Sequence, residues 1–209
     1  MNRYVRLGIN IDHVATLRNA RGGSFPEVIK AAKVVEDSCA DLITVHVRED
    51  RRHINENDLK NILDTINIPV NLEIAANSEM IGIATQQNPE FVCFVPENRK
   101  EITTEGGLNV TKNFKELSKI LKPILETEIN VSIFIDPDRE QIKATNDLGI
   151  STVEFHTGSY ANAFIKNKND NTEFRKIEEN VIFAKEKGIN CHAGHGLTFE
   201  NVSKIAALP

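Results

Sequence analysis

Residues 9–23 read INIDHVATLRNARGG and form the first predicted strand-to-helix turn of the chain. The apolar run that leads into this turn, Val5–Asn10, has the length and composition of a strand buried in a parallel sheet. The turn lacks the GxGxxG pattern that places a dinucleotide pyrophosphate at a helix N-terminus. It carries Asn10, Asp12 and His13 instead. The turn therefore argues against a dinucleotide-binding fold.

Similar apolar runs recur along the chain and alternate with amphipathic segments. The further predicted strands are Leu42–Val47, Val70–Ile74, Phe91–Val95, Ile129–Ile135, Thr152–His156 and Asn190–Ala193. The clearest predicted helices are Pro26–Asp37, Asn113–Leu125 (with Pro123 expected to kink or end it), Asp138–Leu148 and Thr172–Lys187. Glycines at 149 and 188 follow the last two helices and suit a left-handed helix end. Strands alternating with helices predict a parallel α/β architecture, either an open doubly wound sheet or a barrel.

The positions of the polar residues favour the barrel. Each predicted strand delivers an ionisable group near its C-terminal end, and in a barrel these ends share one face. The groups are Asp12 and His13, then His46 and Arg48, Glu73, Glu97, Asp136, Glu154 with His156, and His192 with His195. We therefore expect a TIM (β/α)8 barrel that lacks its eighth β/α unit. Residues 1–209 would form a single barrel domain that is incomplete at its C-terminus, because the chain ends at IAALP, a helix end before a proline, where an eighth strand and helix should follow.

Composition excludes several classes of function. The chain of 209 residues has a net charge of −5, which gives no basic footprint for nucleic acid. It has no signal peptide pattern and no apolar run long enough to span a membrane. Its three cysteines are far apart and form no CxxC pair, which is typical of a reducing compartment. We expect a soluble cytoplasmic protein with a small-molecule ligand.

The segment 46–53, HVREDRRH, is the densest cluster of chemically active residues. His46 and Arg48 lie two apart on a strand and so point the same way. A histidine can both accept and donate a proton near neutral pH, and arginine matches phosphate oxygens bidentately. The segment predicts a phosphate clamp formed by Arg48, Arg51 and Arg52 beside a general base. The alternative is a solvated loop in which acidic neighbours neutralise Arg51 and Arg52.

Two glutamates interrupt apolar strands. Glu73 lies in VNLEIA and Glu154 in TVEFH, where burial would raise the pKa of a carboxyl group towards the range of a general acid or base. A structural ion pair with an arginine is the rival interpretation. Near the end of the chain, AGHGLT at 193–198 surrounds His195 with glycines, and a helix beginning at Leu197–Thr198 would attract an anion.

Other kinds of site are less well supported. A metal centre in a barrel usually shows HxH on a strand, whereas the second strand here reads HVR, so no metal is expected. A Schiff-base aldolase needs a strand lysine, and none of the predicted strands has one. The polar segment 96–112 is either a lid hinged at Gly106–Gly107 or a plain surface loop. A sugar-phosphate isomerase or aldolase and a non-catalytic binding protein remain alternatives.

Taken together, these stretches resemble the pyridoxine 5′-phosphate synthase family. The resemblance rests on GINIDHVATLRNARGG, ITVHVREDRRHI, VNLEIA, VPENRKEITTEGGL, VSIFIDPD, VEFHTGSYA and AGHGLTFENV. It implies a barrel that assembles as a homo-octamer and needs no metal or organic cofactor. It also implies condensation of 1-deoxy-D-xylulose 5-phosphate with 3-amino-2-oxopropyl phosphate, forming pyridoxine 5′-phosphate with release of phosphate and water.

The resemblance also implies a role for each matching residue. His46 and Glu73 would accept protons, His195 would donate one, and Glu154 would stabilise charge in a transition state. The residues implied to hold the aminoketone phosphate are Asn10, Arg21 and Gly196. Those implied to hold the deoxyxylulose phosphate are Asp12, His13, Arg48, His53 and Thr103.

Overall fold

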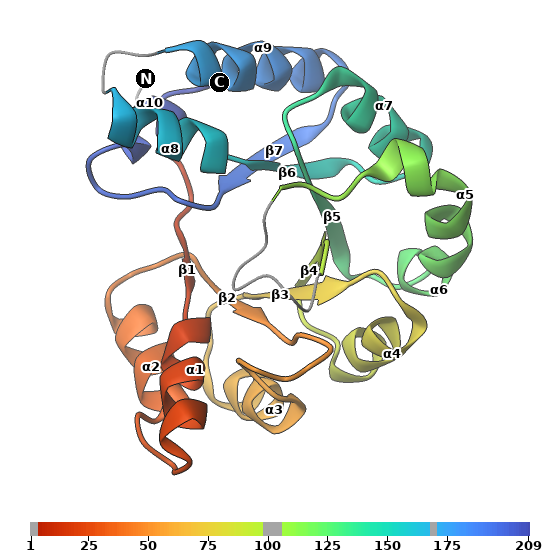
Figure 1. Ribbon diagram of the computed structural model, residues 1–209. Helices are drawn as coiled ribbons and strands as arrows, with labels where there is room; N and C mark the ends of the chain where they lie inside the picture. The colour runs from red at the N-terminus through yellow and green to blue at the C-terminus, as the bar shows by residue number, and fades with distance from the viewer. Residues whose placement is uncertain (1–3, 98–105, 168–170) are drawn as a thin grey trace. The chain divides into compact units, whose positions relative to one another are not determined.

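The computed structural model of the protein describes residues 4–97, 106–167 and 171–209. Strands and helices alternate from the N-terminus to the C-terminus, as the colours of Figure 1 show. The chain divides into two compact units, one formed by Met1–Cys93 with Ile120–Asn130 and the other by Phe94–Lys119 with Val131–Pro209.

The first unit contains three complete strands and most of the N-terminal helices. Its elements are β1 (Gly8–Asn10), α1 (Asp12–Arg21), α2 (Val28–Asp37), β2 (Leu42–His46), α3 (Glu56–Thr65), β3 (Val70–Ala75), α4 (Ser78–Gln87) and α6 (Lys122–Leu125). The three strands are parallel and hydrogen-bonded in chain order, with Asn10 beside Thr44 and His46 beside Glu73. Their C-terminal ends therefore lie at one edge of this part of the sheet, which is where the polar residues occur.

The second unit repeats the pattern with three strands in chain order. Its elements are β5 (Asn130–Ile135), α7 (Arg139–Asp147), β6 (Thr152–His156), α8 (Gly158–Lys166), α9 (Thr172–Glu186), β7 (Asn190–Gly194) and α10 (Val202–Ala206). β4 (Phe91–Val95) and α5 (Val110–Ile120) cross the division between the units. β5, β6 and β7 are parallel, and the register places Phe134 beside Glu154 and Glu154 beside His192.

Burial explains why the central strands are so apolar. In β2, Ile43 and Val45 are fully buried, and in β3 every residue except Glu73 is buried. Strands covered on both faces need apolar side chains in both directions, so their sequences do not alternate. This expectation is wrong for β1 and β7, which contain no fully covered residue. In the described residues each of these two strands has a neighbouring strand on one side only.

Side-chain caps begin several of the helices. Asn55 and Asp58 form a reciprocal capping box at the start of α3, Asn77 caps α4, and Asp138 caps α7. Each such cap satisfies backbone N–H groups that the helix leaves without a partner and contributes about 1 kcal/mol. At the other end, Gly149 and Gly188 adopt the left-handed conformation expected after α7 and α9.

All seven predicted strands are present, with small changes at their ends. β1 begins at Gly8 rather than Val5, because the N–H of Leu7 donates to the side chain of Asp41 instead of to a strand. The predicted helix 113–125 is two helices, α5 and α6, and Pro123 lies in the first turn of the second. The predicted helix 26–37 begins at Val28 instead, after Glu27 at its N-cap.

Candidate active site

The end of β1 is fastened to the end of β2 by Asp12. This residue is the first of α1 and is 6% exposed. One carboxylate oxygen accepts the backbone N–H of His46 at 2.7 Å, and the other accepts the side-chain amide of Asn10 at 2.7 Å. Burial raises the pKa of Asp12, and the hydrogen bond from the backbone of His46 opposes that rise. Asp12 therefore fixes the position of His46 through the main chain.

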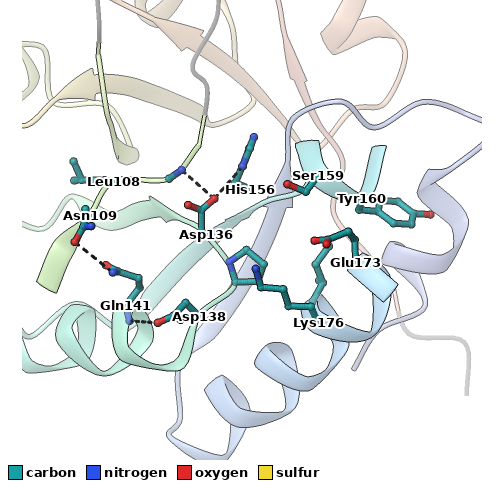
Figure 2. Close-up of a pocket in the computed structure, with 13 residues that line it drawn as sticks. Leu108, Asn109, Asp136, Asp138, Gln141, His156, Ser159, Tyr160, Glu173 and Lys176 are labelled. Carbon is teal, nitrogen blue, oxygen red and sulfur yellow. Dashed lines mark hydrogen bonds and ion pairs between the residues drawn. The ribbon is translucent and has the colours of Figure 1, made fainter. Parts of the chain in front are cut away.

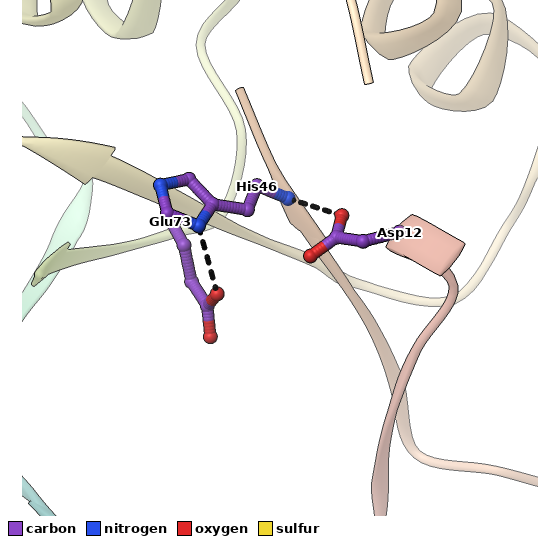
Figure 3. Close-up of side chains that lie close together, drawn as sticks. All are labelled: Asp12, His46 and Glu73. Atoms are coloured by element: carbon purple, nitrogen blue, oxygen red, sulfur yellow. Dashed lines mark hydrogen bonds and ion pairs between the residues drawn. The ribbon is translucent and has the colours of Figure 1, made fainter. Parts of the chain in front are cut away.

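His46 and Glu73 are neighbours across β2 and β3 (Figure 3). They are register partners, and His46 Nδ1 lies 3.7 Å from Glu73 Oε2. Their side chains are 5% and 19% exposed. The separation exceeds that of a direct hydrogen bond but lies within the range of an ion pair. An imidazole and a carboxylate held together on two rigid strands can take up and release protons.

Among the described residues, Asp12, His46 and Glu73 form the group that could hold a metal ion. One ligand atom from each of Asp12, His46 and Glu73 lies within 4.8 Å of the others. Both oxygens of Asp12 already accept hydrogen bonds, so a cation would compete with the contacts that fasten His46. The same three side chains suit proton transfer as well as metal binding. The effect of a chelator on turnover distinguishes these two roles.

A second histidine cluster lies beside this pair. His53 is 6% exposed and sits between β2 and α3, with its ring centroid 5.6 Å from that of His13 and 6.5 Å from that of His46. Burial, and then the charges of His46 and His13, lower the pKa of His53 to about 4. The hydroxyl of Thr16 donates to the carbonyl of Asp12 and lies 2.6 Å from His53 Nδ1. The direction of the hydrogen bond between this hydroxyl and the imidazole is set by the tautomer of His53.

Among the arginines in this segment, Arg48 is the most deeply buried. It is 1% exposed, and its Nε lies 3.8 Å from Asp50 Oδ1. Arg52 pairs with the same Asp50 at 2.6 Å, and this partnership lowers the pKa of Asp50. Asp50 thus neutralises Arg52 as the solvated-loop interpretation required.

Arg51 is also engaged by carboxylates. Its guanidinium contacts Glu56 at 2.8 Å and Glu79 at 2.7 Å. These contacts raise the pKa of Arg51 and tie the segment to α3 and α4. Carboxylates therefore engage both Arg51 and Arg52, and the phosphate clamp stays a prediction.

The backbone around His53 is held by α1. The side-chain amide of Asn19 donates to the carbonyls of Arg52 and His53 at 3.1 and 2.9 Å. The adjacent Arg18 binds Asp58, the capping residue of α3, with 13% and 10% of the two side chains exposed. The segment between β2 and α3 is thus anchored on both sides.

In the second unit, Glu154 is packed against the backbone of β7. A Cβ atom at Gly194 would lie 2.4 Å from Glu154 Oε1, so glycine is required for the glutamate to occupy this place. His192 is the register partner of Glu154 and is the third residue of β7, not its end as the sequence suggested.

His195 and Gly196 follow β7 in a strained turn. Both have the left-handed conformation, with φ of 79° and 75°. Such a φ is unfavourable for a histidine, so neighbouring contacts must hold it. The turn does not lead directly into a helix, because α10 begins at Val202. The predicted helix start at Leu197–Thr198 is wrong. Thr198 is instead a turn residue whose N–H donates to Asn201.

A polar cavity of about 380 Å³ opens beside the ends of β5 and β6 (Figure 2). Asp136 and His156, which follow or end these strands, form one wall, and Ser159, Glu173 and Lys176 from α8 and α9 line it further. Asp136 accepts hydrogen bonds from His156 Nδ1 at 3.1 Å and from the N–H of Gly107 at 3.2 Å. These bonds, the first more than the second, lower the pKa of Asp136.

The remaining predicted residues have simple positions. Arg21 is the exposed last residue of α1, and His13 lies in the first turn of α1 rather than in a loop. Thr103 lies outside the described residues. Gly107 is packed too tightly on β5 for any side chain, since a Cβ there would lie 2.1 Å from the N atom of Asp136. The sequence predicts that the site residues of the first unit and those of the second unit share one face of the barrel. That stays a prediction.

Two features bear on the rival functions. None of the seven strands in the described part of the chain contains lysine, so a strand-borne Schiff base has no candidate there. No helix in the same residues is long and apolar enough to cross a membrane.

Comparison with solved structures shows the fold. The chain superposes on 3-keto-L-gulonate-6-phosphate decarboxylase from Vibrio cholerae with a TM-score of 0.65 and 13% identity, covering 96% of this chain and 82% of that one. It superposes on phosphoribosyl anthranilate isomerase from Thermus thermophilus with a TM-score of 0.56 and 11% identity, covering 98% and 83%. These are TIM-barrel-like enzymes, and the expected barrel class is confirmed.

Comparison of sequences shows the family. The family described as pyridoxal phosphate biosynthesis protein PdxJ matches residues 7–209. The pyridoxine 5′-phosphate synthase of Rhodospirillum rubrum is 47% identical over 209 residues, which is 100% of this chain and 84% of that protein. The synthase of Zymomonas mobilis is 50% identical over 208 residues, which is 100% of this chain and 80% of that protein. The chain therefore belongs to the PdxJ family of pyridoxal phosphate biosynthesis proteins.

Proposed function

We propose that this chain is a pyridoxine 5′-phosphate synthase. It condenses 1-deoxy-D-xylulose 5-phosphate with 3-amino-2-oxopropyl phosphate and forms pyridoxine 5′-phosphate, inorganic phosphate and water, without a metal or organic cofactor. The family match over residues 7–209 carries this proposal. Identities of 47% and 50% with named synthases, over four-fifths or more of their length, support it.

The chemistry of the reaction suits proton-transferring side chains. The amine of one substrate adds to the ketone of the other and water leaves. Phosphate is eliminated, an aldol-type addition closes the ring, and loss of a second water makes the ring aromatic. Every step moves protons and the sum involves no oxidant or reductant. A site for it needs groups that accept and donate protons at fixed positions, and orientation of both substrates supplies the rest.

In the first unit, His46 and Glu73 are the proposed proton acceptors. They sit on adjacent strands with 3.7 Å between Nδ1 and Oε2, a fixed geometry that favours this role. Asp12 holds the main chain of His46 in place. Arg48 would bind a phosphate group with its delocalised charge, which is retained at every physiological pH.

The other proposed roles follow the family resemblance. His195 is the proton donor and Glu154 stabilises charge in a transition state. The aminoketone phosphate is held by Asn10, Arg21 and Gly196, and the deoxyxylulose phosphate by Asp12, His13, Arg48, His53 and Thr103. Gly196 supports this assignment because it is exposed next to His195 and has no side chain to hinder a ligand.

The proposal is tested by incubating the purified chain with both substrates and measuring pyridoxine 5′-phosphate by chromatography. Glu73→Gln and His195→Asn should abolish turnover while circular dichroism stays as in the wild type. The matched control is Glu179→Gln, an exposed glutamate of α9, which should keep full activity. Unchanged rates in both site variants would remove the assignment.

We also propose that the protein is a cytoplasmic homo-oligomer, specifically an octamer, that does not bind nucleic acid. The family resemblance supports the assembly, and the net charge of −5 argues against a polyanionic partner. Light scattering coupled to size-exclusion chromatography measures the assembly. A mass of a single chain of 23.4 kDa would contradict it.

A further inference from the structure

Asp136 and His156 form a pair in the second unit that has no role in the reaction proposed above. His156 Nδ1 lies 3.1 Å from Asp136 Oδ1, and Asp136 also accepts the N–H of Gly107 (Figure 2). The imidazole is 11% exposed, and the carboxylate is 52% exposed on the wall of the cavity. A carboxylate beside Nδ1 fixes the hydrogen on that nitrogen. It therefore also fixes which end of the ring points away from Asp136.

The far end of that ring meets His195. The two ring centroids are 5.0 Å apart with 54° between the ring planes. A Cβ atom at Gly158 would lie 2.5 Å from His156 Nε2 and 3.1 Å from His195 Cδ2. Both imidazoles thus reach the same point above Gly158, at the start of α8. The ring of Phe134 packs against both histidines, with centroids 5.3 and 6.5 Å away.

The backbone of His195 is held by the residue that follows His156. The hydroxyl of Thr157 lies 2.7 Å from the carbonyl of Gly194 and 2.6 Å from that of His195. The N–H of Thr157 also donates to the carbonyl of Gly194, and Thr157 is fully buried. Since His195 has the unfavourable φ of 79°, these contacts account for how the turn keeps that conformation.

We infer that Asp136, His156 and Thr157 are positioning residues for His195. Asp136 orients His156, His156 orients the imidazole of His195, and Thr157 holds its backbone. The inference rests on the proposed function, in which His195 donates a proton. A displacement of a catalytic group by about 1 Å can reduce turnover about 100-fold without weakening substrate binding. These residues should therefore affect kcat much more than KM.

The first test uses one substitution at each residue of the pair. Asp136→Asn removes the charge that fixes the His156 ring, and His156→Phe keeps a ring but removes its nitrogens. Each should lower kcat by about 10- to 100-fold with KM within about threefold of the wild type. The double variant should be no worse than the poorer single variant, because the pair acts as a unit. Glu173→Gln, on the same cavity but away from His195, should leave kcat unchanged.

Two results would overturn the inference. One is a kcat within threefold of the wild type in both single variants. The other is a multiplicative loss in the double variant, which would mean that Asp136 and His156 act independently. A further pair separates positioning from simple destabilisation. Thr157→Ser keeps the hydroxyl and should retain most of the wild-type kcat, whereas Thr157→Val should lose it. Equal loss in both would exclude the hydroxyl as the cause.

A measurement that needs no turnover separates this inference from the proposed function. Nitrogen-15 spectra of the histidine rings report the tautomer of His156 and the surroundings of His195. Asp136→Asn should shift the His195 ring signals, and Glu173→Gln should not. If the wild type makes no pyridoxine 5′-phosphate, the function fails, and shifted His195 signals would still support the positioning contact. Unshifted signals would refute that contact whatever the activity.

Discussion

The buried imidazole of His53 should make the stability of the protein depend on pH. Burial is the main cause that lowers its pKa from 6.5 to about 4, followed by the charges of His46 and His13. The unfolded chain binds a proton at His53 near pH 6.5, whereas the folded chain does so near pH 4. Protons therefore favour the unfolded state between these values. The contribution to stability is complete above the unfolded pKa and is lost as the pH falls towards the folded one.

The size of the effect follows from the two pKa values. At pH 5 an unfolded His53 is almost fully protonated, while the folded one is about nine-tenths neutral. Going from pH 7 to pH 5 should therefore lower the free energy of unfolding by about 2 kcal/mol through this residue alone.

The variant His53→Asn isolates that contribution. Asparagine places a polar atom where Nδ1 meets the hydroxyl of Thr16, and it does not titrate. Urea unfolding of both proteins at pH 7 and pH 5 gives four free energies of unfolding. Groups that titrate in both proteins cancel, so the wild type should lose about 2 kcal/mol more than the variant.

A matched control and a clear refutation complete the design. His13→Asn removes an exposed histidine whose charge is a smaller cause of the shift than burial, and it should keep most of the pH dependence of the wild type. If wild type and His53→Asn lose the same stability between pH 7 and pH 5, burial does not keep His53 neutral. The argument from its environment would then be wrong.

Three further outcomes are expected. Arg18→Met breaks a largely buried ion pair with Asp58 and should lower the free energy of unfolding by about 2 kcal/mol in urea titrations. Lys60→Met, at an exposed ion pair, should change it by less than about 0.5 kcal/mol. Leu72→Ala, at a fully buried position, should cost about 2–5 kcal/mol in the same titrations, and Leu17→Ala, 54% exposed, almost nothing. Dialysis against EDTA should leave turnover unchanged. A loss that a divalent cation restores would show instead that turnover needs a metal, for which the three residues of Figure 3 are the candidate ligands.

The parts of the site that the sequence predicted are those placed by strand periodicity. His46 ends an apolar run and Glu73 interrupts the next one, so the register of two parallel strands is enough to bring them together. Their proximity needed no knowledge of the loops. Asp12 was predicted for the same reason, although its role as a fastener between β1 and β2 depends on a main-chain contact that no pattern encodes.

The parts that were missed depend on contacts between distant segments. Thr16 faces His53 across 37 positions of sequence, and Thr157 reaches the carbonyl of His195 across 38. A threonine after a strand carries no signal for either role. Gly158 likewise has no sequence signal for its role, because the need for glycine follows only from the two imidazoles that meet above it.

Helices were harder to predict than strands. α1 was taken as a loop because its first turn carries the polar residues Asp12 and His13, yet the helix starts directly at the end of β1. α3 and α4 begin at asparagine caps that a search for start signals could have found. The role of Arg51 in holding α3 and α4 together could not be found in this way, because it requires their arrangement in space.

Asp58 serves two helices at once, since its carboxylate accepts from the backbone of Asn55 and from the guanidinium of Arg18. Opening the first turn of α3 should therefore also loosen the end of α1, where the side-chain amide of Asn19 donates to the carbonyl of His53. Local breathing of the two helix ends is coupled as a result. Amide protons at the start of α3 should therefore exchange with solvent at the same rate as those of the segment between β2 and α3 that contains His53. Equal rates would mean that this segment and the two helix ends open together.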